Sequence, residues 1–144
     1  MKNVIIGLAI GISSLSQGQE FKQDFEQAKR QAQQENKNIL LVFSGLEWSD
    51  NSKELDRTVW QSPDFKEYAT DNLVLIKAEF PKRKAWSEPV DVNTQNMVLT
   101  EKYNRDGFFP FVVVLDKNGK VLGKTGYEDL NPKEYIKLLK SFQK

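Results

Sequence analysis

The sequence predicts an α/β domain in which helices flank a central mixed β-sheet. Three observations favour this class. Apolar runs typical of buried strands alternate with helical patterns, the helices stand where crossover connections between parallel strands need them, and a hairpin precedes the last helix. The chain has 144 residues, which is enough for one domain and too short for two of ordinary size.

The first half of the chain alternates between helix and strand. Apolar residues recur at helical spacing from Phe21 to Ala32, so residues 20–36 are predicted to form an amphipathic helix. The continuous apolar run 39–43 predicts a strand buried on both faces. Helical patterns return over residues 49–68, with a second start at Ser62-Pro63-Asp64, and the run 73–80 predicts the next strand.

The second half predicts a loop, a helix, a hairpin and a closing helix. Residues 81–91 form a polar loop, and the following helix passes through Met97, Val98, Leu99 and Tyr103. Residues 111–115 are a third buried strand, and Asp116-Lys117-Asn118-Gly119 supplies the turn to an antiparallel strand over 121–126. Asn131 followed by Pro132 predicts the capped start of the last helix.

Residues 1–18 are predicted to be a signal peptide rather than part of this domain. Lys2 precedes an apolar run from Val4 to Leu15, and Ser16-Gln17-Gly18 places small residues at the two positions that a signal peptidase reads. The run is shorter than the roughly 20 residues that a membrane-spanning helix needs. We therefore expect an exported protein, periplasmic or extracellular, with a mature domain over residues 19–144 and no transmembrane span after cleavage.

Composition excludes several classes of function. Twenty-one basic and twenty acidic residues give a formal net charge of +1, which indicates neither a nucleic-acid-binding surface nor one for anionic membranes. The sequence contains no Cys and no His. Thiolate nucleophiles, disulfides, zinc sites of Cys and His, and His-based acid–base catalysis are therefore excluded, and no cofactor is expected.

One segment carries a family resemblance. Residues 44–55 place Trp48, Lys53 and Leu55 where thioredoxin-like proteins of the secreted type have Trp-Cys-x-x-Cys-Lys-x-Leu at a helix start, with Ser49 and Ser52 in the two cysteine positions. Residues 115–123 resemble the closing hairpin of that family, and Phe109-Pro110 stands where its members have a cis-proline facing the active site. The resemblance covers about residues 35–142 and implies a thioredoxin-like fold with an extra N-terminal helix.

The departures from the family argue against its redox chemistry. Thiol–disulfide exchange requires a thiolate, which a serine hydroxyl cannot replace. The resemblance implies a buried Asp six positions before the first cysteine, and Phe43 stands there. As written, the chain is therefore expected to have no catalytic residue.

Ser49 and Ser52 could alternatively be considered as serine nucleophiles. A base such as His or Lys would have to lie within hydrogen-bond reach. No His exists, and Lys53 follows Ser52 directly, where side chains on a helix diverge. The sequence favours Ser49 as a helix N-cap that accepts a hydrogen bond from the amide of Asn51 or Ser52.

Two charged clusters are interpreted as solvated surface. Glu47, Asp50, Glu54 and Asp56 lack the regular ligand spacing of a calcium loop, so no metal is expected. The run 82–84 beside Trp86 resembles a basic–aromatic patch, but three charges in a neutral exported protein do not predict nucleic-acid binding.

An aromatic cluster is the candidate binding surface. Phe108, Phe109 and Phe111 surround Pro110, and some of these rings must face outward unless a partner covers them. In thioredoxin-like proteins the loop that ends in the cis-proline offers its backbone to an extended peptide, which requires no cysteine. The predicted peptide-binding residues are therefore Trp48, Phe108, Phe109, Pro110 and Phe111. Gly107 departs from the family pattern, because it stands three positions before Pro110 where the resemblance implies two.

Three functions remain open at this stage. The first is an exported thioredoxin-like domain without redox-active cysteines that binds a protein or peptide between Trp48 and Pro110. The second is a thiol–disulfide oxidoreductase whose Cys-x-x-Cys is replaced by Ser49-Asp50-Asn51-Ser52 in this chain. The third is a structural module of an envelope assembly.

Overall fold

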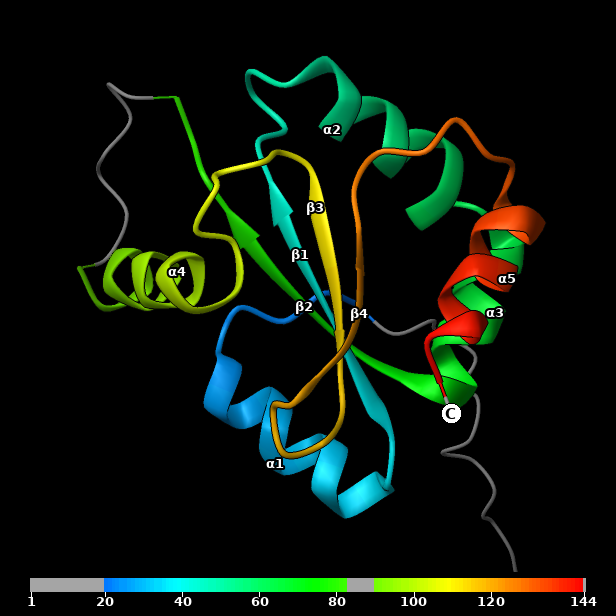
Figure 1. Ribbon diagram of the computed structural model, residues 1–144, viewed down its shortest axis with the longest axis horizontal. Helices are drawn as coiled ribbons and strands as arrows, with labels where there is room; N and C mark the ends of the chain where they lie inside the picture. The colour runs from blue at the N-terminus through cyan, green and yellow to red at the C-terminus, as the bar shows by residue number, and fades with distance from the viewer. Residues whose placement is uncertain (1–19, 83–89, 144) are drawn as a thin grey trace, which may run out of the picture.

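A computed structural model describes residues 20–82 and 90–143, which form a four-stranded mixed sheet with helices on both faces (Figure 1). The strands lie in the order β2-β1-β3-β4. β1 pairs with β2 in parallel and with β3 antiparallel, and β3 pairs with β4 antiparallel. In chain order the strands are β1 (Asn38–Ser44), β2 (Leu73–Glu79), β3 (Phe111–Leu115) and β4 (Val121–Thr125). The predicted α/β class with a mixed sheet is confirmed.

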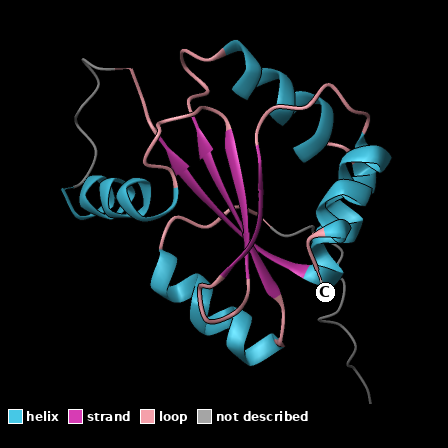
Figure 2. Ribbon diagram, in the orientation of Figure 1, coloured by secondary structure: helices cyan, strands magenta, loops and turns pink. Residues whose placement is uncertain are grey.

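The helices divide between the two faces of the sheet, as Figure 2 shows in outline. α1 and α4 cover one face, and α2, α3 and α5 lie on the other, with a short π-helical turn, η2, continuing α2. Their bounds are α1 (Phe25–Glu35), α2 (Asp50–Leu55), η2 (Asp56–Trp60), α3 (Pro63–Asn72), α4 (Val90–Tyr103) and α5 (Pro132–Ser141). None of the helices in the described ranges is long and apolar enough to cross a bilayer.

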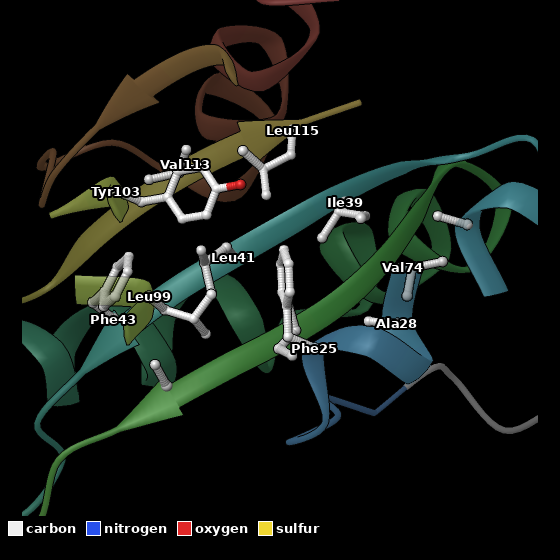
Figure 3. Close-up of a cluster of buried hydrophobic side chains, with 13 residues drawn as sticks. Phe25, Ala28, Ile39, Leu41, Phe43, Val74, Leu99, Tyr103, Val113 and Leu115 are labelled. Atoms are coloured by element: carbon white, nitrogen blue, oxygen red, sulfur yellow. The ribbon is translucent and has the colours of Figure 1, made fainter. Parts of the chain in front are cut away.

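The alternation of side chains along β1 builds one core on each face. Ile39, Leu41 and Phe43 pack under α1 and α4, as the close-up in Figure 3 shows, whereas Leu40 and Val42 pack against α2, α3 and α5. All five side chains are at most 1% exposed. A strand buried on both faces explains the continuous apolar run that predicted it.

The predicted start of the first helix is wrong by five residues. α1 begins at Phe25, because the Asp24 carboxylate accepts a hydrogen bond from the amide of Gln27 and caps the helix there. Before it, Lys22 forms a parallel bridge to Ile76 of β2, and Phe21 packs edge-on against Trp60, which belongs to the core on the opposite face from α1. Phe21 has helical spacing to Phe25, but the backbone of the next residue, Lys22, pairs with β2 instead of continuing the helix.

The other predicted helix starts agree with the structure. The side chains of Ser49, Ser62 and Asn131 cap α2, α3 and α5, and Glu134 completes a capping box with Asn131.

The polar loop was predicted to reach residue 91, whereas α4 starts at Val90. The proposed signal peptide and most of the 82–84 basic run, with Trp86, lie outside the described residues.

Candidate functional site

The candidate site lies at the end of the sheet where β1 and β2 finish and several connections meet (Figure 1). β1 and β2 are parallel and end there, β3 begins there, and α2 starts directly beyond β1. This topology brings residues 45–52, residues 80–82 and residues 107–111 together from three separate parts of the chain. It therefore unites the predicted serine pair with the predicted aromatic cluster.

The turn between β1 and α2 is closed by its own polar groups. The carbonyl of Gly45 accepts hydrogen bonds from the amides of Trp48 and Ser49, at 3.1 and 2.7 Å. The Oγ of Ser49 accepts from the amide of Ser52 at 3.1 Å, which confirms its predicted role as N-cap. Ser52 is only 2% exposed, and its Oγ accepts from the amide of Gly45 at 3.1 Å. Both hydroxyls are thus acceptors for main-chain amides.

No charged side chain of the described residues forms a hydrogen bond with either hydroxyl. The Nζ of Lys53 lies 3.9 Å from a carboxylate oxygen of Asp50. The other acidic residues of the predicted solvated cluster also have partners: Glu54 pairs with Arg57 at 2.6 Å, and Asp56 lies 3.8 Å from Lys77. Within the part of the chain that the structure describes, no group of three or more acidic side chains is placed to hold a metal ion.

Trp48 and Phe109 meet across the mouth of the site. Their ring centroids are 5.2 Å apart in an edge-to-face arrangement, and Phe80 approaches Phe109 at the same distance and in the same way. The indole Nε1 of Trp48 donates to the carbonyl of Phe80 at 2.8 Å. Together with Pro81 and Lys82 these residues line an apolar depression of about 360 Å³, the first groove.

A second groove lies on the other side of Phe109. It has a volume of about 340 Å³, and its lining comprises Asn51, Phe108, Phe109, Pro110, Phe111, Gly126 and Tyr127. Phe108 is 56% exposed and Trp48 is 44% exposed, which is unusual for such large apolar side chains. All five predicted peptide-binding residues therefore line one groove or the other.

The loop that presents Phe108 and Phe109 is fixed by one buried amide. The side chain of Asn104, 3% exposed, donates to the carbonyl of Phe108 at 2.9 Å and accepts from its amide at 3.1 Å. Gly107 adopts a φ of +73°, a left-handed conformation that glycine enters without strain. The Phe109–Pro110 peptide bond is cis, as the resemblance implied. Among the described residues, the main-chain N–H and C=O of Phe109 have no hydrogen-bond partner.

Sequence reasoning missed several residues of the site. Phe80 and Tyr127 were not recognised as groove walls, and Asn104 gave no signal beyond its position after a helix. Glu79 follows an apolar run, and its Oε2 accepts from the amide of Leu46 at 2.7 Å, while Oε1 is buried without a partner among the described residues. A carboxylate that ends a buried strand was the available signal for Glu79.

Tyr127, which lines the second groove, has a raised pKa. Partial shielding from solvent, followed by the carboxylates of Asp129 and Glu54, raises the pKa of Tyr127 above its ordinary value. The guanidinium of Arg57 opposes this shift. Like an ordinary tyrosine, Tyr127 is neutral at physiological pH, and the shift keeps it neutral to a higher pH.

Comparisons with known proteins agree with this architecture. A family model described as thioredoxin-like matches residues 20–117, a range that includes α1. The disulfide bond reductase DsbH of Chlamydia pneumoniae is 28% identical over 119 residues, which cover 83% of this chain and 70% of DsbH. The thioredoxin-related protein DsbJ of the same organism is 21% identical over 103 residues, 72% of this chain but only 29% of DsbJ.

Solved structures show the same likeness. A DsbH oxidoreductase structure superposes with a TM-score of 0.80 at 25% identity, covering 88% of this chain and 85% of the other. A thioredoxin from Thermus thermophilus superposes with a TM-score of 0.63 at 14% identity and covers 87% of each chain, which shows the fold alone.

Proposed function

The chain belongs to the thioredoxin-like family, and from that premise we propose that it is an exported polypeptide-binding member that performs no thiol–disulfide exchange with its own side chains. The observation that carries this proposal is the pair of grooves that meet at Phe109, the first apolar and the second lined by aromatic and polar groups. An apolar surface of this kind marks a binding site more often than ordinary solvated surface.

The chemistry of the serine positions supports the non-catalytic part. A disulfide forms when a thiolate attacks sulfur, and the sequence contains no cysteine to supply either atom. Ser52 is buried and Ser49 caps α2, so neither hydroxyl is presented to a substrate together with a base. Recognition of a polypeptide, by contrast, needs only apolar contacts and main-chain hydrogen bonds.

The main-chain groups of Phe109 support an extended ligand. Its N–H and C=O have no partner among the described residues and lie beside both grooves, so a peptide can add as a short strand with alternate side chains directed to the same face. The relative DsbH is named a disulfide bond reductase. We propose that this chain keeps a site at the same place in the fold without that chemistry.

Amide chemical-shift perturbation tests the proposal. Reduced and carboxymethylated α-lactalbumin, which stays unfolded and offers no free thiol, is titrated into the ¹⁵N-labelled protein. We expect shifts to concentrate at residues 45–52 and 107–111. Phe108→Ser should weaken the binding at least fivefold, whereas Met97→Ser on α4 is a matched control, since Met97 is 59% exposed and Phe108 is 56% exposed. Uniform or absent shifts would leave the structural-module function instead.

A second candidate is an oxidoreductase whose cysteines are serine in this chain. The observation that favours it is the position of Ser49 and Ser52 at the start of α2, together with the name of the relative DsbH. Sequencing codons 49 and 52 of the source gene decides between the two, because cysteine codons there would make the enzymatic function the natural one.

Export is proposed from the leader pattern of residues 1–18. Intact-mass analysis of protein recovered from the native host should give a chain that starts at Gln19 or within a few residues of it. Recovery of protein that retains Met1 from the cytosol would contradict export.

A further inference from the structure

The charges around the two grooves differ, and this difference bears on which polypeptide binds. Lys82 lines the first groove, and its main-chain amide donates to the carboxylate of Glu47 at 3.0 Å, so one charge of each sign borders that groove. Tyr127 of the second groove lies near charges of both signs: the carboxylates of Asp129 and Glu54 raise its pKa, and the Arg57 guanidinium lowers it.

Some of the carboxylates near the second groove already have cationic partners. Asp50, next to the lining residue Asn51, lies 3.9 Å from Lys53, and Glu54 pairs with Arg57 at 2.6 Å. These pairs are internally compensated and attract an outside charge only weakly.

Glu128 and Asp129 are different, because no cation of the described residues pairs with either of them. Both are exposed, and they directly follow Gly126 and Tyr127 of the groove lining. Glu128 accepts a hydrogen bond of 3.1 Å from the Thr125 hydroxyl. Two exposed carboxylates without a cationic partner among the described residues thus directly follow Tyr127 of the second groove.

We propose that the occupant of the grooves is an extended polypeptide segment with two large apolar side chains, one for each groove, flanked by Lys or Arg that faces Glu128 and Asp129. This inference rests on the proposed function, since it specifies the ligand of the same surface. Apolar side chains two positions apart in an extended segment lie on one face about 7 Å apart, so they can be placed on either side of Phe109. The flanking cation then lies near the carboxylates of Glu128 and Asp129.

Electrostatic complementarity of exposed groups gives discrimination rather than most of the affinity. Each exposed pair changes affinity by roughly two- to fivefold, and a like charge opposes binding by a similar factor. A cationic ligand should therefore bind at least threefold more tightly than an anionic one at low salt. The difference should disappear at high salt, where the Debye length falls to about 3 Å at 1 M.

Fluorescence anisotropy with two labelled Cys-free peptides tests this proposal on the full chain. Both peptides carry Leu-Ser-Phe within a Gly-Ser background, and the residues that flank this core are Lys in one peptide and Glu in the other. We expect the Lys peptide to bind more tightly in 20 mM salt and the two to become equal in 0.5 M salt. The double variant Glu128→Gln, Asp129→Asn should remove the discrimination without abolishing binding.

A matched control carries the same change in net charge far from the grooves. Glu67 and Asp71 are exposed on α3, which leads directly into the start of β2. The grooves lie beyond the other end of this seven-residue strand. Glu67→Gln, Asp71→Asn should therefore preserve the discrimination between the two peptides.

The outcomes separate the two proposals. Equal binding of both peptides at low salt, or tighter binding of the Glu peptide, overturns the charge preference and leaves polypeptide binding intact. Failure of both peptides to bind overturns both proposals. If sedimentation shows a dimer that Phe108→Ser disperses and that neither peptide displaces, a second copy of the chain occupies the grooves and the proposal is wrong.

Discussion

Substitution of Gly45 by alanine tests how the first groove is built. A Cβ atom at this position would lie 2.4 Å from Cε2 and Cζ2 of the Trp48 indole and 2.9 Å from its Nε1. Atoms do not approach so closely, and the indole is the group that can move, because it is a side chain at the surface. Gly45→Ala should therefore displace the ring and leave the backbone of β1 in place.

The cost follows from the contacts that the indole loses. Its hydrogen bond to the Phe80 carbonyl contributes about 0.5–1.5 kcal/mol. Its edge-to-face contact with Phe109 contributes a similar amount, about 0.5–1.5 kcal/mol. The free energy of unfolding should fall by about 1–3 kcal/mol, and Tm by roughly 4 °C for each kcal/mol in a domain of this size.

Denaturant unfolding and the indole N–H signals in a proton–nitrogen spectrum measure these effects. The indole signal of Trp48 should move, and binding of an apolar peptide should weaken at least fivefold because the first groove loses a wall. Gly126→Ala is the control within the same site: its Cβ would meet the Pro110 carbonyl at 3.6 Å, an ordinary contact, so stability should change by less than about 0.5 kcal/mol. A Gly45→Ala variant with unchanged Tm and indole signals would refute this account of the groove.

Three further predictions concern the loop, the serine pair and acid stability. Asn104→Ala removes both bonds that hold the 104–108 loop and should lower stability by about 1–3 kcal/mol, with faster amide exchange over residues 107–109, measured by mass spectrometry. Ser49→Cys, Ser52→Cys should form an intramolecular disulfide, detected by thiol titration, with only weak insulin reduction because Phe43 cannot relay protons; activity in the Cys-free parent would contradict the functional argument. Amides of the turn, Lys120 first, lower the pKa of Asp116, so its carboxylate stabilises the fold above the unfolded pKa of about 3.9 and loses this effect as pH falls through its lower folded pKa. Asp116→Asn should therefore unfold more easily than the parent at pH 7, and the difference should shrink as the pH falls through the folded pKa of Asp116, as followed by circular dichroism.

Most of the fold could be predicted because its strongest sequence signals are local. The continuous apolar runs of β1 and β3 reflect burial on both faces, and the Asn-Pro start of α5 is set by capping within one turn. Phe21 shows where this fails. Its spacing to Phe25 is helical, but the pairing of Lys22 with β2 is a long-range hydrogen-bond pattern that no local period reveals.

The site was only partly predictable for the same reason. Trp48 and the aromatic cluster around Pro110 stood out by residue type, whereas Phe80 became part of the site through its contact with Phe109, 29 positions later. Asn104 looked like an ordinary polar residue after a helix, and only the folded loop shows that both of its amide atoms hold Phe108. Contacts that only the folded chain creates leave no pattern in the local sequence, so they could not be predicted from it.

The hydroxyls of Ser49 and Ser52 explain why a thioredoxin-like site without sulfur keeps its shape. The amide of Gly45 is buried and needs an acceptor, which the Oγ of Ser52 supplies at 3.1 Å, and Ser49 satisfies the amide of Ser52 in the same way. A cysteine sulfur is a weaker acceptor than a hydroxyl oxygen, so serine strengthens the turn that positions Trp48. The aromatic contacts of Trp48 and Phe109 do not involve either hydroxyl. The contacts that shape the first groove therefore do not depend on sulfur at either position.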